Sequence, residues 1–166
     1  MKNEVSQTET EIKSCSITQV MKPESNRVPA NTRVKLTDVV VTARVEEGIF
    51  VQQKDAQSYG GIFILAPMGG RMLKPGNHLN ITGVVKGNIQ TRWIEPESIN
   101  ISKKNEEPAI SPIEITARKS LDPYSGMLVK LHSDHTAFAL NIDTADGLEG
   151  VLDTRLGDFM LNLLVN

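Results

Sequence analysis

Four phrases decide the fold of this chain: Val39-Val40-Val41-Thr42-Ala43, Gly48-Ile49-Phe50-Val51-Gln52, Gly60-Gly61-Ile62-Phe63-Ile64 and Ile81-Thr82-Gly83-Val84-Val85. They are short, apolar and rich in β-branched residues, and glycines stand where the chain turns, which is typical of strands. No stretch between residues 33 and 101 reads as a helix. Together with a fifth strand that follows, they predict a small closed barrel, because closure removes unpaired strand edges.

The expected strands cover residues 33–44, 49–53, 61–65, 79–85 and 90–94, and the last continues through 99–101 after a break at Pro96. The connection between the third and fourth strands, residues 66–76, contains two prolines and three glycines. Both residue types disfavour a helix, so we expect none there. The predicted fold class is therefore mainly all-β.

Residues 1–27 are predicted to form a flexible leader, because residues 1–16 are polar and nearly free of apolar side chains. Within this leader, residues 17–20 are expected to be a short strand or a staple that closes one end of the barrel. The barrel itself is assigned to residues 28–104. Residues 105–120, which include Pro108 and Pro112, are assigned to an extended linker.

Residues 121–166 are predicted to contain strands over residues 127–131 and 138–142. A terminal helix is also expected, because five apolar side chains follow the helical period: Leu156, Phe159, Met160, Leu163 and Leu164. A strand over residues 159–165 is the alternative, since Gly157 weakens a helix. About 45 residues cannot easily form an independent core, so this segment should pack on the barrel or on a partner chain.

Charge is divided unevenly along the chain, although the net charge is only −2. Residues 27–104 carry eleven Lys/Arg against six Asp/Glu, whereas residues 105–166 carry four against ten. A basic barrel can attract a polyanion, or the acidic segment can dock on it. Cys15 is the single cysteine, so we expect no internal disulfide. The polar N-terminus has no signal-peptide core, and no membrane span is expected.

The order of the apolar phrases, with Lys74-Pro75-Gly76 before the last one, resembles the OB-fold domain attached to bacterial extracellular nucleases of the endonuclease/exonuclease/phosphatase type. The resemblance covers roughly residues 34–101. The phrase Tyr124-Ser125-Gly126-Met127-Leu128-Val129 looks like the opening of a second, tandem OB unit. The resemblance implies a five-stranded Greek-key barrel, here without the helix between strands three and four, and a secreted or periplasmic location.

This chain departs from that family in three respects. Gln53 stands where an aspartate is usual, the second unit is too short to close, and no catalytic nuclease domain follows. We therefore do not carry over nuclease activity, and we predict that no metal-dependent nuclease activity is present. Nucleic-acid binding is carried over as an expectation.

OB barrels commonly bind ligands across strands two and three. If Ile49 and its alternate neighbours point inward, a candidate surface for single-stranded nucleic acid consists of Arg44, Phe50, Gln52, Lys54, Tyr59, Phe63, Lys86, Arg92 and Trp93. Aromatic side chains that stack on bases and cations that follow phosphates are what such binding needs. The alternative is that Phe50 and Phe63 belong to the core. We favour it, because aromatic residues are few here and large apolar residues are usually buried.

No catalytic residue, metal site or cofactor is predicted. The chain has no phosphate-binding glycine loop, nucleophile elbow or His-Glu-x-x-His motif. His132-Ser133-Asp134-His135 offers too few converging ligands for zinc, and Asp143-Thr144-Ala145-Asp146-Gly147 lacks the closing glutamate of a calcium loop. We interpret both as turns, and we assign no role to His78.

Two functions follow as expectations. The first is a non-catalytic OB-fold module that binds single-stranded nucleic acid weakly. The second is a protein-interaction or assembly module, in which the barrel and the acidic residues 121–166 contact a protein partner or a second copy of the chain. The apolar stretch 159–165 motivates the second, because so short a segment needs burial.

Overall fold

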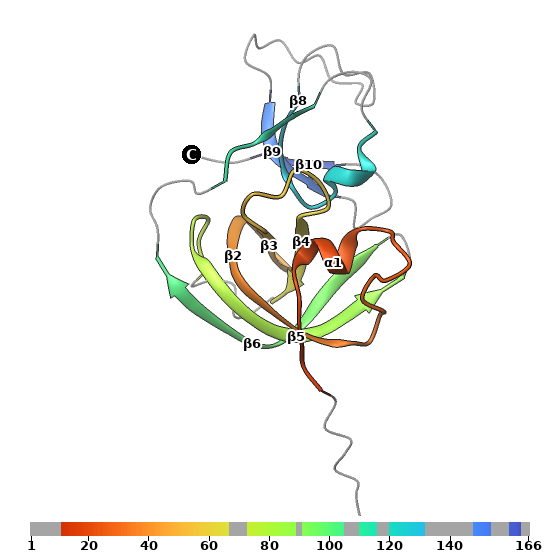
Figure 1. Cartoon of the computed structure of the whole chain (residues 1–166). Helices are drawn as coiled ribbons and strands as arrows, with labels where there is room; N and C mark the ends of the chain where they lie inside the picture. The colour runs from red at the N-terminus through yellow and green to blue at the C-terminus, as the bar shows by residue number, and fades with distance from the viewer. Residues whose placement is uncertain are drawn as a thin grey trace, which may run out of the picture.

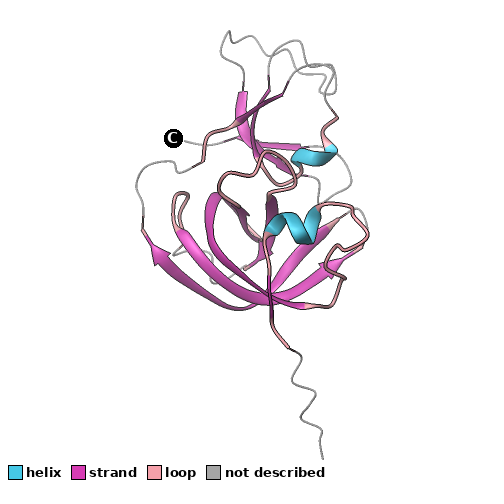
Figure 2. Cartoon of the chain, viewed as in Figure 1, coloured by secondary structure: helices cyan, strands magenta, loops and turns pink. Residues whose placement is uncertain are grey.

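The computed structural model describes residues 11–66, 73–88, 91–104, 110–115, 120–131, 148–153 and 160–163. Figure 1 shows a strongly curved barrel with a smaller sheet stacked above it. Strands are the main element of the described residues, which also contain the short helical pieces α1 and η3 (Figure 2). The elements of the barrel region are β1 (Lys13–Ser14), α1 (Ile17–Met21), β2 (Arg33–Val45), β3 (Gly48–Gln52), β4 (Gly61–Leu65), β5 (His78–Gly87) and β6 (Arg92–Lys103).

Five strands close into a barrel in the order β2-β3-β4-β6-β5, and β5 pairs with β2 to complete the circle. The β4–β6 pair is parallel, and the other pairs of the circle are antiparallel. This connectivity, in which the last two strands exchange places, is that of the OB fold. The predicted all-β barrel is thus confirmed by the strand order.

The expected break at Pro96 is a β-bulge within one continuous strand. Thr82 lies opposite Ser98 and Gly83 lies opposite Pro96, so Glu97 is the extra residue of β6. Because proline cannot donate a backbone hydrogen bond, a bulge is one of the places where a strand tolerates it. The thirteen-residue β2 has a similar irregularity between Leu36 and Val39, which lets it serve two neighbouring strands.

The barrel interior is filled by aliphatic side chains that alternate along each strand. Ile49 and Val51 from β3 meet Ile62 and Ile64 from β4, and all four are 0–1% exposed. These residues face inward as the two-residue period predicts. The same cluster takes in aliphatic residues from β2, β5 and β6.

One end of the barrel is closed by α1, which precedes the first barrel strand. Ser16 and Gln19 form a reciprocal capping box at its start, and Ile17 and Val20 are fully buried in the barrel core. Gln53 Oε1 accepts a hydrogen bond from the backbone N–H of Thr18, at 3.3 Å. Gln53, which stands where an aspartate is usual in the family that the sequence resembles, thus contacts α1 and helps to hold it on the barrel.

Residues 11–27 therefore differ from the predicted flexible leader, because they include β1 and α1, and residues 1–10 lie outside the description. Burial of Ile17 and Val20 stabilises the ordered form of this segment, and β1 adds a parallel contact with β2. The short closing element expected at residues 17–20 is a helix rather than a strand. In the connection from β4 to β5, the described residues 66 and 73–77 contain no helix, and residues 67–72 lie outside the description.

The C-terminal region forms a second sheet in the order β10-β9-β8-β7. Its elements are β7 (Ile113–Ile115), the helical turn η3 (Asp122–Tyr124), β8 (Leu128–Leu131), β9 (Leu148–Asp153) and β10 (Met160–Leu163). The pairing of β7 with β8 is parallel, and the next two pairs are antiparallel. We call β7–β10 with η3 the C-terminal unit.

The C-terminal unit differs from two expectations. Residues 113–115 lie in the predicted linker but form β7, because β8 offers them a parallel backbone partner. Residues 160–163, for which a helix and a strand are both considered, form β10, paired from Met160 opposite Asp153 to Leu163 opposite Gly150. Pairing with β9 overrides the short helical period, and the alternative of a strand is the correct one there. The strand expected at residues 138–142 lies outside the described residues.

The closure of the barrel by α1 gives a testable prediction. Val20→Ala and Ile17→Ala should each lower the free energy of unfolding, by roughly 1–2.5 and 2–5 kcal/mol respectively, because each leaves a cavity in the barrel core. Chemical denaturation followed by circular dichroism measures the change. Ile12→Ala is the matched control, since Ile12 is 42% exposed, and it should change stability by less than about 0.5 kcal/mol. Equal losses of unfolding free energy at positions 12 and 17 would contradict the burial of α1 in the barrel core.

Candidate functional site

The surface on which OB folds commonly carry ligands is the outer side of β3 and β4. Strand register places two rows of side chains there, because residues that pair directly across strands point to the same side of a sheet. One row runs through Ala43, Phe50, Phe63, Trp93 and Lys86, and the other through Gly61, Gln52, Val40, His78 and Lys103. We call these two rows the outer face.

Phe50 and Phe63 form the centre of the outer face. Their ring centroids lie 5.2 Å apart with an interplanar angle of 59°, which is a favourable tilted aromatic pair. Both point away from the barrel interior, yet they are only 2% and 5% exposed. The side chains of Ile110, Leu128 and Val151 pack with them in one apolar cluster. The rings are therefore outside the barrel core, as the binding hypothesis required, but inside a second core.

Gln52 is buried by the same contact. Its Oε1 accepts a hydrogen bond of 2.7 Å from the backbone N–H of Leu128, and the residue is 2% exposed. This bond satisfies two polar groups that burial would otherwise leave unpaired. Gln52 thus joins the barrel to the C-terminal unit. The hypothesis of an exposed ligand surface at Phe50, Gln52 and Phe63 is corrected by their burial, and the favoured alternative is right that the two rings are buried but wrong that they lie in the barrel core.

The backbones of the two parts meet at glycines. A Cβ atom on Gly61 would lie 2.2 Å from the carbonyl oxygen of Gly126, so no side chain fits there. Gly126 has a φ of +78°, a conformation that favours glycine. Nearby, the backbone N–H of Tyr59 donates to the carbonyl of Pro123 at 2.6 Å. The phrase that resembles the opening of a second OB unit is therefore the segment that docks on the barrel.

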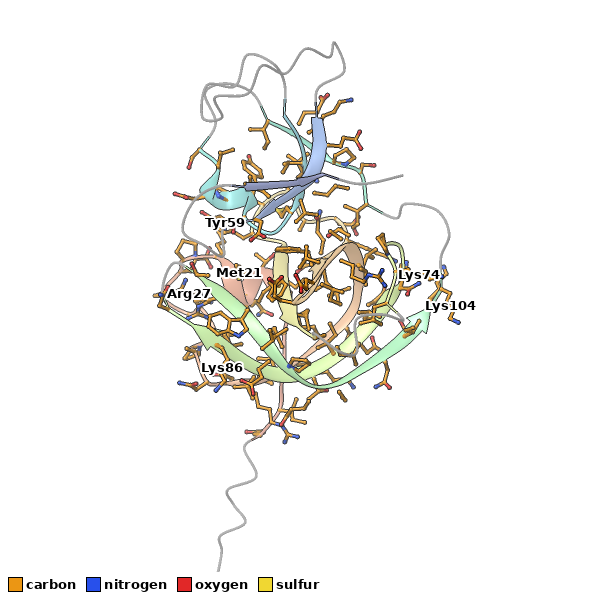
Figure 3. The ribbon with its side chains drawn as sticks, turned by 180° about the vertical axis from the view of Figure 1, so that it is seen from behind. Met21, Arg27, Tyr59, Lys74, Lys86 and Lys104 are labelled. Atoms are coloured by element: carbon orange, nitrogen blue, oxygen red, sulfur yellow. The ribbon has the colours of Figure 1, made fainter. Side chains whose placement is uncertain are left out.

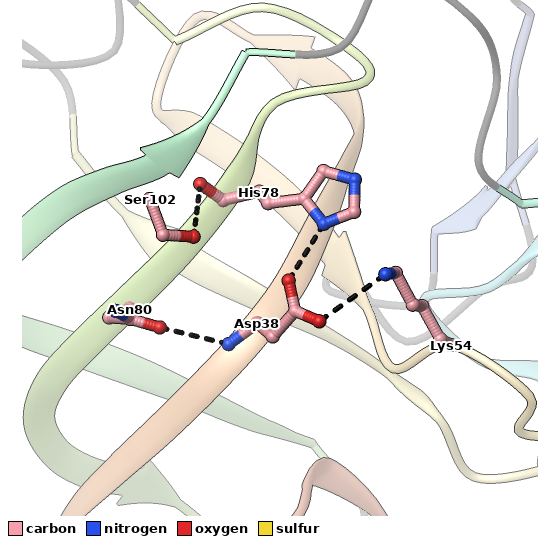
Figure 4. A network of polar contacts seen from close by, with 5 residues as sticks. All are labelled: Asp38, Lys54, His78, Asn80 and Ser102. Atoms are coloured by element: carbon pink, nitrogen blue, oxygen red, sulfur yellow. Dashed lines mark hydrogen bonds and ion pairs between the residues drawn. The ribbon is translucent and has the colours of Figure 1, made fainter.

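Lys54, one of the predicted phosphate-binding residues, takes part in a polar network beside the outer face (Figure 4). Its Nζ lies 3.3 Å from Asp38 Oδ2, and His78 Nδ1 lies 2.7 Å from Asp38 Oδ1. Asn80 Oδ1 accepts from the Asp38 backbone N–H at 3.0 Å, and Ser102 Oγ donates to the His78 carbonyl. The network ties the irregular part of β2, where Asp38 has a φ of +54°, to β5 and to the loop after β3.

The network also explains His78, which sequence reasoning left without a role. His78 is 1% exposed, and its Nε2 is buried without a hydrogen-bond partner among the described residues. The hydrogen bond from His78, together with the Lys54 ammonium, holds the pKa of Asp38 below its ordinary value. No signal in the sequence linked residues 38 and 78, because a β-bulge brings them together.

Arg92 is bound internally. Its Nη1 donates to the carbonyl oxygens of Val20 and Val28, at the end of the barrel that α1 closes. Burial, and the positive charge of Arg27 nearby, lower the pKa of Arg92 from its usual value. This guanidinium therefore holds the N-terminal segment on β6, which differs from its expected role in following phosphates.

The remaining predicted residues are dispersed. Trp93 and Lys86 lie opposite each other at the edge of the outer face, both half-buried, while Arg44 is exposed near the end of β2. Tyr59 is half-buried beside the C-terminal unit. Figure 3 shows Arg27 and Lys86 on one side of the barrel and Lys74 and Lys104 on the opposite side. These labelled cations do not form one stripe.

Among the described residues, no group of three side chains is suited to hold a metal ion. The two candidate turns at residues 132–135 and 143–147 lie outside the description. None of the described helices is both long and apolar enough to cross a membrane.

No protein-family model matches this chain, and no curated protein sequence does. Among solved structures, the hypothetical protein ygiW from E. coli is 17% identical, covers 45% of this chain and 78% of its own, and has a TM-score of 0.37. The OBody AM1L10, bound to hen egg-white lysozyme, is 15% identical with coverages of 56% and 94% and a TM-score of 0.43. A chain of the replication protein A heterotrimer bound to ssDNA is 11% identical with coverages of 56% and 82% and a TM-score of 0.41.

The Asp38 network gives a prediction of pH dependence. A carboxyl whose pKa is lower in the folded than in the unfolded state stabilises the fold above its unfolded pKa, and this contribution is lost as the pH falls through the folded pKa. Asp38→Asn should therefore lower the free energy of unfolding at pH 7, by about 1 kcal/mol or less because Asp38 is half exposed. The difference from the unaltered protein should shrink as the pH falls below about 4.

Urea denaturation at several pH values measures this difference. Asp55→Asn is the matched control, because Asp55 is also an exposed aspartate with a positive φ, of 64°. The control should show little difference at any pH. If the loss of unfolding free energy in Asp38→Asn persists unchanged to pH 3, the ionised carboxylate is not what stabilises the bulge.

Proposed function

We propose that this chain is a non-catalytic OB-fold module for protein association, whose outer face binds the C-terminal unit rather than a nucleic acid. The single observation that supports this function most is the burial of Phe50, Gln52 and Phe63 beneath the C-terminal unit. The absence of the sequence motifs of common enzymes supports the non-catalytic part of the proposal.

The free energy of apolar burial favours a protein interface over base stacking at the outer face. Burial of a side chain such as Phe, Leu, Ile or Val contributes about 1.5–3 kcal/mol. The five large apolar side chains that meet here, Phe50, Phe63, Ile110, Leu128 and Val151, therefore contribute on the order of 10 kcal/mol. Stacking contributes about 1–3 kcal/mol per base, and the two phenylalanines offer two such platforms. A nucleic acid would not displace the C-terminal unit at this cost.

The architecture of the C-terminal unit supports the same proposal. β7 to β10 repeat the pairing sequence of β1 to β4, in which one parallel pair is followed by two antiparallel pairs. In both halves a helical element precedes the second strand, α1 in the first and η3 in the second. We interpret the unit as the first part of a second OB-like fold, docked on the outer face of the first.

One observation favours a second candidate function. Trp93 and Lys86 remain half-buried at the edge of the outer face, and Arg27 lies on the same side of the barrel (Figure 3). An indole opposite a lysine, with an arginine on the same side of the barrel, can hold a nucleotide weakly, by stacking and by contact with phosphate. Nucleic-acid binding by this chain would then use the edge of the outer face and not its centre.

Phe63→Ala separates the two functions. As part of an interface core, Phe63 should stabilise the fold, and the substitution should lower the free energy of unfolding by about 3–5 kcal/mol. Fluorescence anisotropy of a labelled single-stranded oligonucleotide at low salt should show no saturable binding to the unaltered chain. Trp93→Ala is the companion variant, and it should cost less stability because Trp93 is only half-buried.

Saturable, salt-sensitive binding that Phe63→Ala abolishes while stability stays unchanged would overturn the proposed function. Binding that Trp93→Ala abolishes and Phe63→Ala leaves intact at a temperature where both remain folded would establish the second candidate instead.

A further inference from the structure

Among the described residues, a long part of β6 has a paired strand on one side only. Its pairing with β4 covers Phe63 opposite Trp93 and Ile64 opposite Ile94, and no further residue pairs are formed between these strands. From Glu95 to Lys103 the described partner of β6 is β5 alone. An edge of this length presents a row of backbone N–H and C=O groups to which another strand can add.

An open groove of about 440 Å³ runs beside this edge. It is lined by Ala66, Leu73, Pro96, Glu97, Ser98, Ile99 and Ile101. Ile101 is 36% exposed, one of the few large apolar side chains in the described chain that are so accessible. The groove therefore combines unpaired backbone with apolar side chains, which are the two features used when an extended segment adds to a sheet.

We infer that the partner at this edge is β6 of a second copy of the chain, added antiparallel about a two-fold axis at Ile99. The part of the strand that follows its contact with β4 is acidic at its start, at Glu95, and basic at its end, at Lys103. Glu97 is already paired with Arg33, at 2.6 Å, so Glu95 is the carboxylate that remains for a partner strand. An antiparallel copy reverses that order, so the acidic end of each strand meets the basic end of the other. A two-fold arrangement makes both contacts at once, because such an interface is self-complementary.

The register follows from the side on which each residue lies. Pairing about Ile99 places Glu95 opposite Lys103 of the second copy, and both lie on the outer side of the barrel, where their β5 partners are Val84 and His78. Ser98 then lies opposite Asn100, also on that side. Ile99 meets its own equivalent on the inner side, and Ile101 lies diagonally across from it, within reach of a side-chain contact.

The middle of the edge lacks the devices that usually prevent such pairing. Proline, lysine and β-bulges protect an edge. Here Pro96 and the bulge at Glu97 stand near one end, and Lys103 with a second register shift stands near the other. Between them, residues 98–101 carry no charge and no proline. This association uses the edge of β6 and, of the outer face, only Lys103 at its margin. It does not involve Phe50, Gln52 or Phe63, so it goes beyond the proposed function and does not rest on it.

Sedimentation equilibrium of the full chain, from low micromolar to several hundred micromolar, tests the inference. We expect a reversible shift from the mass of one chain to the mass of two. Ile101→Lys places a charge in the middle of the pairing and should weaken association at least about tenfold. Ile12→Lys is the matched control, because Ile12 is similarly exposed but lies directly before β1, away from the pairing edge of β6. Association should stay unchanged in this variant.

Charge reversal tests the register. Glu95→Lys and Lys103→Glu should each weaken association roughly threefold to tenfold, because each puts like charges opposite one another twice in the dimer. The double variant should restore it. A single-chain mass over the whole range overturns the inference, as does a dimer that Ile101→Lys leaves intact. Failure of the double variant to restore association overturns the two-fold register, and none of these outcomes bears on the Phe63→Ala test.

Discussion

The structure depends on two adjacent strands that are buried on both sides. Every residue of β3 is buried, and so are the first four of the five residues of β4. A strand of a small antiparallel barrel usually has one face on the core and one face in water. Here the inner side chains fill the barrel, while the outer ones, Phe50 and Phe63, need a second covering layer. The C-terminal unit supplies that layer, and a second apolar cluster, separate from the barrel core, forms between the two.

That covering requires close approach of two backbones. The contact of Gly61 with Gly126 brings β4 and the start of the C-terminal unit within a distance that a methyl group would prevent. The hydrogen bond from Leu128 to Gln52 then satisfies the polar groups that this approach removes from water. Glycines at such positions let the two sheets dock closely, and the buried amide of Gln52 provides a hydrogen-bond partner for the Leu128 backbone N–H.

Sequence alone predicted the barrel strands well, because alternation of Ile, Val and Phe fixes which side of a strand each residue occupies. It did not predict whether the outer side is covered, since Phe50 has the same pattern under a ligand, under water or under another sheet. The five-residue α1 is too short for a periodic signal, although its capping pair Ser16 and Gln19 is visible in the sequence. The Asp38–His78 contact arises from a bulge, which no period reveals.

Charge composition suggested that an acidic tail is attracted to a basic barrel, but the contacts point to a different force. The described interface cluster consists of aliphatic and aromatic side chains, and the hydrogen bonds beside it include those of Gln52 with the Leu128 backbone and of the Tyr59 and Pro123 backbones. Two barrel cations instead serve the barrel itself, Arg92 by binding backbone carbonyls and Lys54 by pairing with Asp38. Exposed ion pairs contribute about 1 kcal/mol or less, whereas each buried apolar side chain contributes more. Removal of apolar area from water therefore decides how the two parts associate.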